Sequence, residues 1–496
     1  MFGSIAEKYG LADRLREIFG PEIGDALLAL SWRLASDGGA LAESEAWFEQ
    51  FESPLGMNVS NKDVAGILES VTKEDISFFY DVWAGSFKKK AGAVLYVLNS
   101  KPRLGRPSLS ATWGHDAHEE LLPPDRHILV RLEGSSAPLF AWTLEGGLLD
   151  EKSLEGVLQF AEKLGVKPIR LVLDQDVASD EFVDYLFRRE FPFVRNVEVT
   201  TKWAKKIVKG GRSVLGSLGA ARFFRRGEYH ADSVSCRWTR ALSPSPKGRA
   251  NEEFFAEPVK SRPTASAAKD EAAERPLCLA HVVFCHEFGL RREIQFSVEL
   301  GEERERLMAD PEAAPKKEFE RFLIVTEGLR QKERHVVQDQ RQLSAEPFHL
   351  DGSFCFLTND ASLASPYSAL SEHLTRTDLE KDFEDVMNDL DWVEFSLYRK
   401  KLREARVFLQ FLAEIFLGEI RAAFAAEPLG QPERELRETL ARVNGLYKIR
   451  FNDDEDDEDR DFFPALTEAQ RKIVKTYVKG HYKTRGVYPD KWDVDF

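Results

Sequence analysis

The spacing of apolar positions predicts that the first 80 residues are helical. Six apolar residues keep roughly helical spacing, namely Ile5, Tyr9, Leu11, Leu15, Ile18 and Phe19. Ser60 and Thr72 each precede a helix-like stretch and each has an aspartate three residues later, which is the pattern of a helix N-cap. We therefore expect several short helices before residue 91.

From residue 91 the pattern changes to short apolar runs rich in branched and aromatic side chains. Three such runs, "AVLYVL" (93–98), "HILVRL" (127–132) and "LFAWTL" (139–144), have the composition and length of β-strands. Gly134 with Ser135-Ser136 separates the last two runs, as the turn of a hairpin would. The pattern thus predicts three strands, the last two of which form a hairpin.

Helices and strands then alternate. We expect a helix over 150–165, a strand over 168–176, a helix over 179–190 and a strand over 191–199. A strand meander followed by such units predicts an α/β protein of the α+β multidomain kind, with a mixed sheet flanked by helices. The ribonuclease-H-like core has this order of elements.

The remainder is less regular. Residues 241–276 are rich in Pro, Ser, Ala and charge and predict a flexible loop, whereas 277–288 and 292–300 resemble strands of a separate β-rich insertion. A strand over 353–360 and a long helix over 369–390 follow, and Thr467 with Gln470 predicts a capping box for a basic last helix. The expected domains are a helical N-terminal region (1–90), the first part of the core (91–200), the insertion (201–350), the completion of the core (351–443) and an acidic loop with the basic helix (444–496).

Composition bounds the function classes. The four cysteines are too few and too scattered for a disulfide framework, which favours a reducing cytoplasm, and no signal peptide is recognisable. The most apolar helix candidate, 407–420, is interrupted by Gln410, Glu414 and Glu419, which favours a buried core helix over a membrane span. A net charge of −15 alone argues against nucleic-acid binding.

Charge is unevenly distributed, however. Asp453 to Asp459 are seven consecutive acids, whereas residues 202–226 carry eight Lys or Arg and no acid. Such a basic run is either a solvated face or a surface that contacts phosphate. Its candidate DNA-binding residues are Lys202, Lys205, Lys206, Lys209 and Arg212.

Two segments carry candidate chemistry. Asp174 ends an apolar strand, at the sheet edge where ligands bind in α/β proteins, although a lone acid there is as often a helix cap or turn residue. In the helix 369–390, Leu379 and Phe383 share the core-facing stripe, and Arg376 and Glu380 lie on its flank. On spacing alone, Arg376 and Glu380 form an ordinary intrahelical ion pair.

The order and spacing of several segments resemble a DDE-type transposase of bacterial insertion sequences, in the group with a tyrosine–arginine–glutamate–lysine signature. The resemblance covers nearly the whole chain. The segment that ends in Gly146, Gly147 and Asp150 resembles the strand pair of the core with its turn of small residues. "LVLDQDVASDEFVDYL" resembles the segment of the second catalytic Asp, and "SALSEHLTRTDLEKDFEDVMNDL" that of the catalytic Glu.

Through this resemblance, Asp174 is implied to be the second catalytic acid and Glu380 the third. Such enzymes are implied to cut and join double-stranded DNA, the element ends and the target, with carboxylates that hold two Mg²⁺ ions. Arg376 and His373 are implied to contact DNA beside these metal ligands. The resemblance also implies a homodimer on paired DNA ends and a cytoplasmic, nucleoid-associated location.

The sequence departs from the signature at several positions. The first catalytic Asp is expected after Tyr96, where Val97 stands, and valine cannot bind a cation. The Tyr and Lys positions of the signature helix hold His373 and Met387, and Gln175-Asp176 replaces the Arg-Gly that follows the second acid.

Substitute ligands are conceivable at three positions. Asp81 lies before the strand among helical residues, Asn99 lies on the same face as Val97, and Asp116 lies in a loop. Two hypotheses follow, namely an active transposase with an unusual first ligand, or a transposase-derived DNA-binding or regulatory protein that has lost strand cleavage. A partner-binding protein without a DNA role is the third. If the carry-over is right, Val97 should lie beside Asp174 and Glu380.

Overall fold

The computed structural model divides the chain into two compact units. Unit 1 comprises Met1–Pro192 and His373–Phe496, and unit 2 comprises Phe193–Glu372. The residues that the structure describes are 2–37, 41, 44–50, 59–87, 92–100, 125–144, 149–199, 201–215, 221–224, 227–243, 251–259, 275–310, 313–317, 319–327, 334–339, 341–342, 352–387, 400–425, 447–448 and 461–462.

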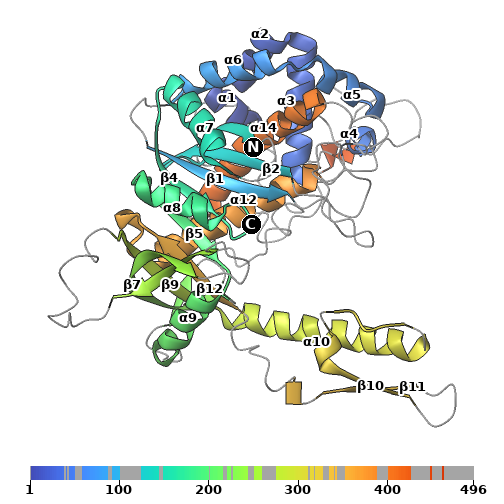
Figure 1. Cartoon of the computed structure of the whole chain (residues 1–496). Coiled ribbons are helices and arrows are strands. Elements are labelled where there is room, and N and C mark those ends of the chain that lie inside the picture. The colour runs from blue at the N-terminus through green and yellow to red at the C-terminus, as the bar shows by residue number, and fades with distance from the viewer. Residues whose placement is uncertain are drawn as a thin grey trace, which may run out of the picture. The chain divides into compact units, whose positions relative to one another are not determined.

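Unit 1 begins with the helices expected before residue 91 (Figure 1). The Ser60 hydroxyl accepts a hydrogen bond from the Asp63 amide at 3.3 Å, and Thr72 accepts one from the Asp75 amide at 3.1 Å, so both predicted N-caps are confirmed. The helices are α1 (Phe2–Tyr9), α2 (Leu11–Phe19), α3 (Pro21–Asp37), α4 (Ser44–Gln50), α5 (Asn61–Ser70) and α6 (Lys73–Ala84).

The sheet of unit 1 has the strand order β3-β2-β1-β4. β1 (Gly92–Ser100) pairs antiparallel with β2 (Asp125–Leu132) and parallel with β4 (Lys167–Leu173), and β2 pairs antiparallel with β3 (Pro138–Thr143). Gly134, with φ of 76°, lies in the β2–β3 turn. The mixed sheet and its flanking helices confirm the predicted fold class, α/β with a ribonuclease-H-like order of elements.

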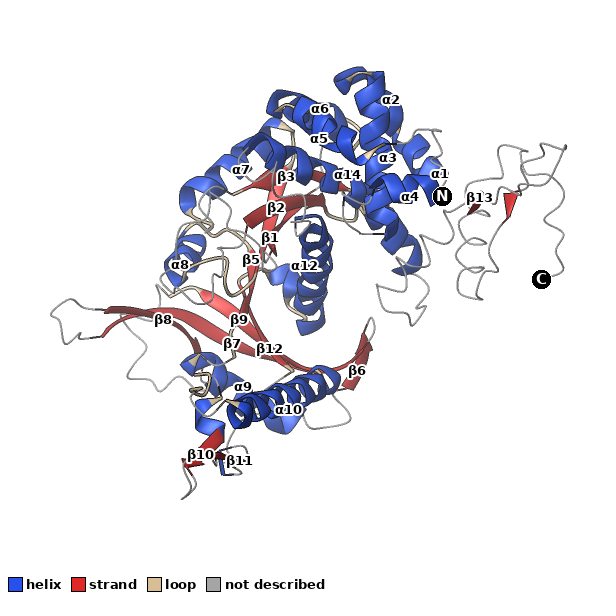
Figure 2. Ribbon diagram, turned by 90° about the vertical axis from the view of Figure 1, so that its right-hand side faces the viewer, coloured by secondary structure: helices blue, strands red, loops and turns tan. Residues whose placement is uncertain are grey.

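Helices cover both faces of this sheet. Trp142 of β3 packs on Phe160 of α7 (Glu151–Lys163), with ring centroids 5.5 Å apart. On the other face, the ring of His127 from β2 lies 6.0 Å from that of Phe383 in α12 (Pro366–Met387). Figure 2 shows α7 and α12 on opposite sides of the strands.

Helix α14 (Lys400–Ala425) is the main core helix of unit 1. Phe408 and Phe411 pack against Tyr80 of α6, with ring centroids 6.0 and 4.9 Å apart. Almost every side chain from Leu402 to Ile420 is buried, so the predicted core helix is confirmed. In the described part of the chain, no helix combines the length and apolarity that crossing a membrane requires.

Helix α8 (Asp180–Arg188) follows β4 along the chain in unit 1, and its N-cap is Ser179. Unit 2 contains an antiparallel sheet in the order β5-β12-β9-β7-β6, and β8 also pairs with β7. Its strands are β5 (Phe193–Val197), β6 (Ala221–Phe224), β7 (Gly227–Ser243), β8 (Asn251–Pro258), β9 (Leu277–Phe284) and β12 (Ser353–Thr358).

The predicted loop 241–276 is wrong in part, because β7 extends into it and β8 lies within it. β8 was not predicted as a strand because its acids gave the segment a loop-like composition, although Phe254 and Ala256 alternate with other residues and are buried. The prediction of a strand over 292–300 is also wrong, because these residues lie inside the helix α10 (His286–Ala309).

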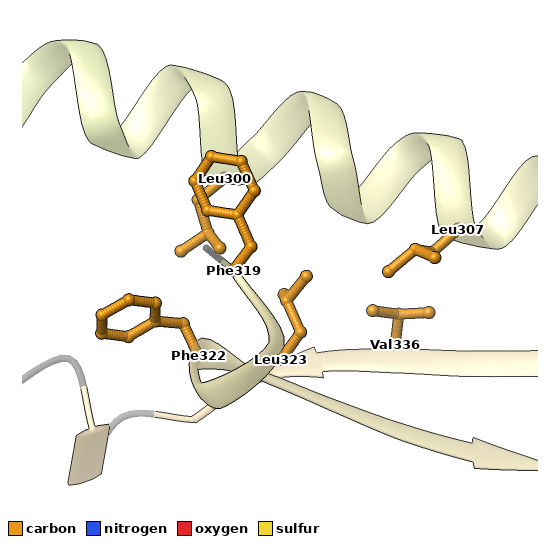
Figure 3. Close-up of a cluster of buried hydrophobic side chains, with 6 residues drawn as sticks. All are labelled: Leu300, Leu307, Phe319, Phe322, Leu323 and Val336. Carbon is orange, nitrogen blue, oxygen red and sulfur yellow. The ribbon is translucent and has the colours of Figure 1, made fainter. Parts of the chain in front are cut away.

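Helix α10 packs on a short hairpin to form a small satellite core (Figure 3). The hairpin consists of β10 (Leu323–Glu327) and β11 (Arg334–Gln338), preceded by the 3₁₀ helix η3 (Glu320–Phe322). The buried side chains of the cluster are Leu300, Leu307, Phe319, Phe322, Leu323 and Val336.

Near the C-terminus, β13 (Tyr447–Lys448) pairs with β14 (Asp461–Phe462). The acidic run and the predicted basic last helix lie outside the described residues.

Candidate functional site

Asp174 and Glu380 are brought together by one arginine. Asp174 follows β4 directly, and Arg376 and Glu380 are one turn apart on α12. The Arg376 guanidinium donates to Asp174 Oδ2 through Nη2 and to Glu380 Oε2 through Nη1, each at 3.0 Å. The side chain of Arg376 is 2% exposed, whereas those of Asp174 and Glu380 are 19% and 17% exposed. The two acids that the resemblance implies as metal ligands thus share one partner, and the Arg376 guanidinium lies between them.

His373 lies one turn before Arg376 on the same helix and is buried. Burial, and secondarily the positive charge of Arg376, lower the pKa of His373 to about 4, although Asp174 acts in the opposite direction. His373 is therefore neutral at physiological pH. It therefore offers no positive charge to a phosphate, and the DNA contact that the resemblance implies for His373 stays a prediction.

The strand register places Val97 on the face opposite the Asp174–Arg376–Glu380 cluster. Val97 pairs with Ile128, and Ile128 pairs with Trp142, which packs on α7. Directly paired residues of an antiparallel ladder point to the same face. Val97 therefore faces α7, and the expectation that it lies beside Asp174 and Glu380 is wrong.

The neighbouring residue, Leu98, occupies the relevant face instead. Leu98 pairs with His127, whose ring contacts Phe383 of α12. Tyr96 pairs with Val172 of β4, so continuing the register brings Leu98 level with Asp174. Tyr96 and Leu98 are two residues apart in the strand, so both point to this face, and both are buried. Neither supplies a carboxylate to the cluster.

Of the three substitute ligands, only the side chain of Asp81 is described, and it does not reach the cluster. Asp81 lies on α6, and its carboxylate is 4.0 Å from the Lys163 ammonium of α7. Asp176 is exposed, and its carbonyl accepts a hydrogen bond from Arg126. Asp116 lies outside the described residues, as do the side chains of Asn99 and Met387.

This set of residues does not fit a two-metal site. Two Mg²⁺ ions need several hard oxygen ligands, and here two carboxylates and one guanidinium carry a single net negative charge. The guanidinium also occupies one oxygen of each carboxylate. Across the described ranges, no three His, Cys, Asp or Glu side chains are grouped so that they could bind a metal.

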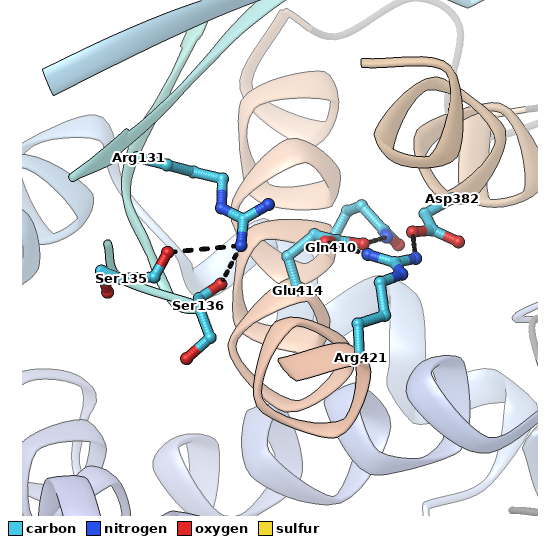
Figure 4. Close-up of polar contacts among 7 residues, drawn as sticks. All are labelled: Arg131, Ser135, Ser136, Asp382, Gln410, Glu414 and Arg421. Atoms are coloured by element: carbon cyan, nitrogen blue, oxygen red, sulfur yellow. Dashed lines mark hydrogen bonds and ion pairs between the residues drawn. The ribbon is translucent and has the colours of Figure 1, made fainter. Parts of the chain in front are cut away.

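A second ion-pair network, which the sequence did not predict, anchors α12 on α14 (Figure 4). Arg421 donates to the buried Asp382, two residues beyond Glu380, and to the buried Glu414 at 3.1 Å. Gln410 contacts Glu414 at 3.5 Å. Because Arg421 binds Asp382, helix α12 cannot rotate about its axis, and Arg376 and Glu380 are kept facing Asp174. The sequence could have indicated this network, because Glu414 and Arg421 are seven residues apart and therefore lie two turns apart on one face of the helix.

The first part of the basic run forms helix α9 (Lys202–Leu215) of unit 2, and Arg222 lies on β6. Ala204, Ile207 and Val208 are buried against the sheet, whereas Lys202, Lys206 and Lys209 are exposed and Lys205 is half-buried. The backbone of Arg212 continues the helix, but its side chain is not described. The lysines therefore lie along the solvent side of an amphipathic helix.

Comparisons with known proteins identify no family. No family model matches the sequence, and no curated protein matches it. Among solved structures, the chain is similar to one in a cryo-EM structure of the piggyBac transposase synaptic complex with hairpin DNA, with a TM-score of 0.30 and 8% identity. The match covers 99% of this chain and 86% of that chain. A likeness at this level establishes neither a family nor a function.

Proposed function

We propose that this chain is a DNA-binding protein built on a transposase-derived ribonuclease-H-like core, and that it does not cleave DNA by two-metal catalysis. The observation that carries the proposal is the Arg376 guanidinium, which bridges Asp174 and Glu380 where the resemblance implies metal ions. The ligand that the resemblance requires from β1 is replaced by aliphatic or aromatic side chains on both faces of the strand.

Electrostatics support the loss of metal binding. A buried guanidinium that donates to two carboxylates already compensates half of their negative charge. A metal ion would have to displace Arg376, whose side chain is 2% exposed and would then be buried without its partners. Mg²⁺ is expected only for the active alternative.

The support for DNA binding comes from α9. Its four lysines between Lys202 and Lys209 are spaced along one helix that contains no acid. Phosphate contacts of this kind give affinity without sequence readout and weaken steeply with salt. A protein with a net charge of −15 that still binds DNA would do so through such a local surface.

Cleavage is tested on supercoiled and linear DNA with the purified full chain in Mg²⁺ and in Mn²⁺. We expect no nicking above the level of a matched Asp174→Asn preparation. Cleavage that the Asp174→Asn substitution abolishes would refute the proposed loss of activity.

DNA binding is tested by titrating a labelled duplex at several salt concentrations. Replacing Lys202, Lys206 and Lys209 by Gln should lower the affinity and reduce the salt slope by up to about 0.9 per lost phosphate contact. A control variant replaces Lys152 and Lys163, the exposed lysines of α7, by Gln and should leave the slope unchanged. Equal slopes in both variants would exclude α9 as the DNA-binding element, and the absence of salt-sensitive binding in the wild type would favour a partner-binding protein without a DNA role.

One observation favours the second candidate, an active transposase. Asp174 and Glu380 converge on one side chain from two different elements, which is the convergence that a catalytic pair needs. In that case Arg376 would have to move, and a third ligand would have to come from outside the described residues. Homodimer formation on paired DNA ends is part of both candidates and can be checked by light scattering with and without duplex DNA.

A further inference from the structure

Unit 2 contains a pocket that the proposed DNA-binding function does not use. Its volume is about 310 Å³, and it lies between strands β6 and β7 and the start of α12. The lining residues are Arg222, Ala231, Asp232, Ser233, Ser365, Pro366 and Tyr367. The pocket therefore contains a cation, hydroxyl groups and an aromatic ring at one place, together with the carboxylate of Asp232, which accepts a hydrogen bond from the Ser233 amide at 2.8 Å.

Ser233 in this pocket is hydrogen-bonded to a buried histidine. Ser233 of β7 and His281 of β9 are directly paired across the ladder, and Ser233 Oγ lies 2.8 Å from His281 Nδ1. His281 Nε2 lies 2.8 Å from the carbonyl oxygen of Leu363, in the 3₁₀ helix η5 (Ala361–Leu363). Because a carbonyl only accepts, Nε2 carries the proton and Nδ1 is the acceptor. The Ser233 hydroxyl therefore donates to the imidazole, and its oxygen lone pairs are available to the pocket.

The protonation state of His281 suits a base. The side chain is fully buried, and burial lowers its pKa, although the hydrogen bond to Leu363 acts in the opposite direction. The imidazole is thus neutral at pH 7 and can accept a proton. The Leu363 carbonyl would stabilise the imidazolium that forms.

We propose that Ser233 is a nucleophile activated by His281, and that the pocket accepts a small ester that carries a negatively charged group. A hydroxyl with its proton committed to an imidazole, and the imidazole oriented by a third group, is the arrangement that activates serine for acyl transfer. This activity is independent of the DNA-binding proposal, since none of its residues belongs to the Asp174–Arg376–Glu380 cluster or to α9.

The reaction balances within these groups and water. Ser233 Oγ forms a bond to the acyl carbon while its proton moves to His281 Nδ1. The ester C–O bond then breaks, and the leaving oxygen takes that proton from Nδ1. Water releases the acyl group by the same two steps, with His281 first accepting a proton from water and then returning it to Ser233 Oγ.

Arg222 is the group that would select an anionic substrate. Its guanidinium lies 5.1 Å from the centroid of the Tyr367 ring, and the Tyr367 hydroxyl donates to the Tyr229 carbonyl at 3.3 Å. The ring therefore holds one face of the guanidinium, and among the described residues none forms a hydrogen bond or ion pair with its N–H groups, which can bind a carboxylate or phosphate.

The nucleophile is tested with a fluorophosphonate probe on the purified full chain, followed by mass spectrometry of the labelled peptide. We expect one adduct on Ser233, formed as fluoride leaves the phosphorus. Ser233→Ala should abolish the adduct. Ser235→Ala, an exposed serine on the same strand that is paired with Leu279 instead of a histidine, should not change it. Labelling that Ser233→Ala does not reduce, or no labelling at all, would overturn the proposal.

Substrate class is tested with two nitrophenyl esters, the neutral acetate and the anionic hemisuccinate. The wild type should hydrolyse both, and Arg222→Gln should slow the anionic ester about tenfold relative to the neutral one. Equal effects on the two esters would reject Arg222 as the selecting group. His281→Gln should lower both rates, and if that variant does not fold, the Ser233 and Ser235 pair still decides the outcome.

Discussion

The guanidinium of Arg376 is 2% exposed and donates at 3.0 Å to two carboxylates that come from different elements. Its removal would leave Asp174 and Glu380 facing each other without a cation. Breaking a buried pair in this way costs more than the pair itself contributes, because an uncompensated charge remains.

Arg376→Gln should therefore destabilise unit 1 by about 2–4 kcal/mol. Urea unfolding followed by fluorescence measures this change. The double variant Arg376→Gln/Asp174→Asn removes one of the two orphaned charges and should recover part of the loss. No recovery in the double variant would show that Asp174 is not coupled to Arg376.

A carboxylate at position 98 should convert the cluster into a cation site. Leu98→Asp adds a third acid on the α12 face, level with Asp174, so Mn²⁺ should raise its unfolding temperature more than that of the wild type. Val97→Asp is the matched control, because it buries an acid on the α7 face and should cost about 3–5 kcal/mol without any response to Mn²⁺. An equal response of the two variants would mean that the face assignment is wrong.

The acids of the candidate site could be predicted from sequence, but the β1 position could not. A strand end and helix spacing, which are local properties, singled out Asp174 and Glu380 as candidates, and the family resemblance joined them into one site. The face that Val97 occupies depends on its pairing with Ile128 and on the packing of Trp142, which are distant in sequence. Since side chains alternate along a strand, an error of one residue in the motif moves the position to the opposite face.

At the scale of elements, α10 shows how a segment that fits both the strand period of two and the helix period of 3.6 residues can be assigned wrongly. Residues 292–300 alternate apolar and polar side chains as a strand does, yet Phe296, Leu300 and Leu307 also share one face of a helix. The helix forms because these residues pack on the hairpin. Ile294 and Val298, which also belong to the alternating pattern, are each left 55% exposed.

Two substitutions in α10 should separate these faces. Leu307→Ala removes a fully buried side chain from the satellite core and should cost about 2–4 kcal/mol in local stability. Ile294→Ala, at an exposed position, should change stability by less than about 0.5 kcal/mol. Amide hydrogen exchange of α10 and the β10–β11 hairpin measures both effects, and similar protection in the two variants would contradict the packing described.

At the scale of the whole molecule, Glu419 of α14 connects distant parts of unit 1. It accepts hydrogen bonds from Lys8 at 2.5 Å and Tyr9 at 2.6 Å in α1, and from Ser136 in the β2–β3 turn. Gly418 permits this approach, because a Cβ at that position would lie 2.1 Å from the Ser136 carbonyl oxygen. The order of these elements was predictable, but their convergence on one carboxylate was not, since it depends on contacts more than 280 residues apart.

The network should make stability depend on pH. Partial burial opposes ionisation of Glu419, but the hydrogen bonds from Lys8, Ser136 and Tyr9 outweigh it and lower its pKa. A carboxylate whose pKa is lower in the folded state stabilises the protein at pH values above its ordinary pKa of about 4.5. This contribution is lost as the pH falls through the pKa of the folded state. Glu419→Gln should therefore flatten the stability curve below about pH 5, as measured by urea unfolding at a series of pH values. A curve parallel to that of the wild type would exclude this role.

The same network has a consequence for synthesis on the ribosome. Lys8 and Tyr9 are made first, but Glu419, their partner, is made 411 and 410 residues later. At translation rates of about 5–20 residues per second, the N-terminal helix waits roughly 20–80 s for the segment on which it docks. During that time the apolar face of α1, including Phe2 and Ile5, lacks its partner Phe416. The nascent chain would therefore be a natural client for a chaperone until α14 leaves the ribosome.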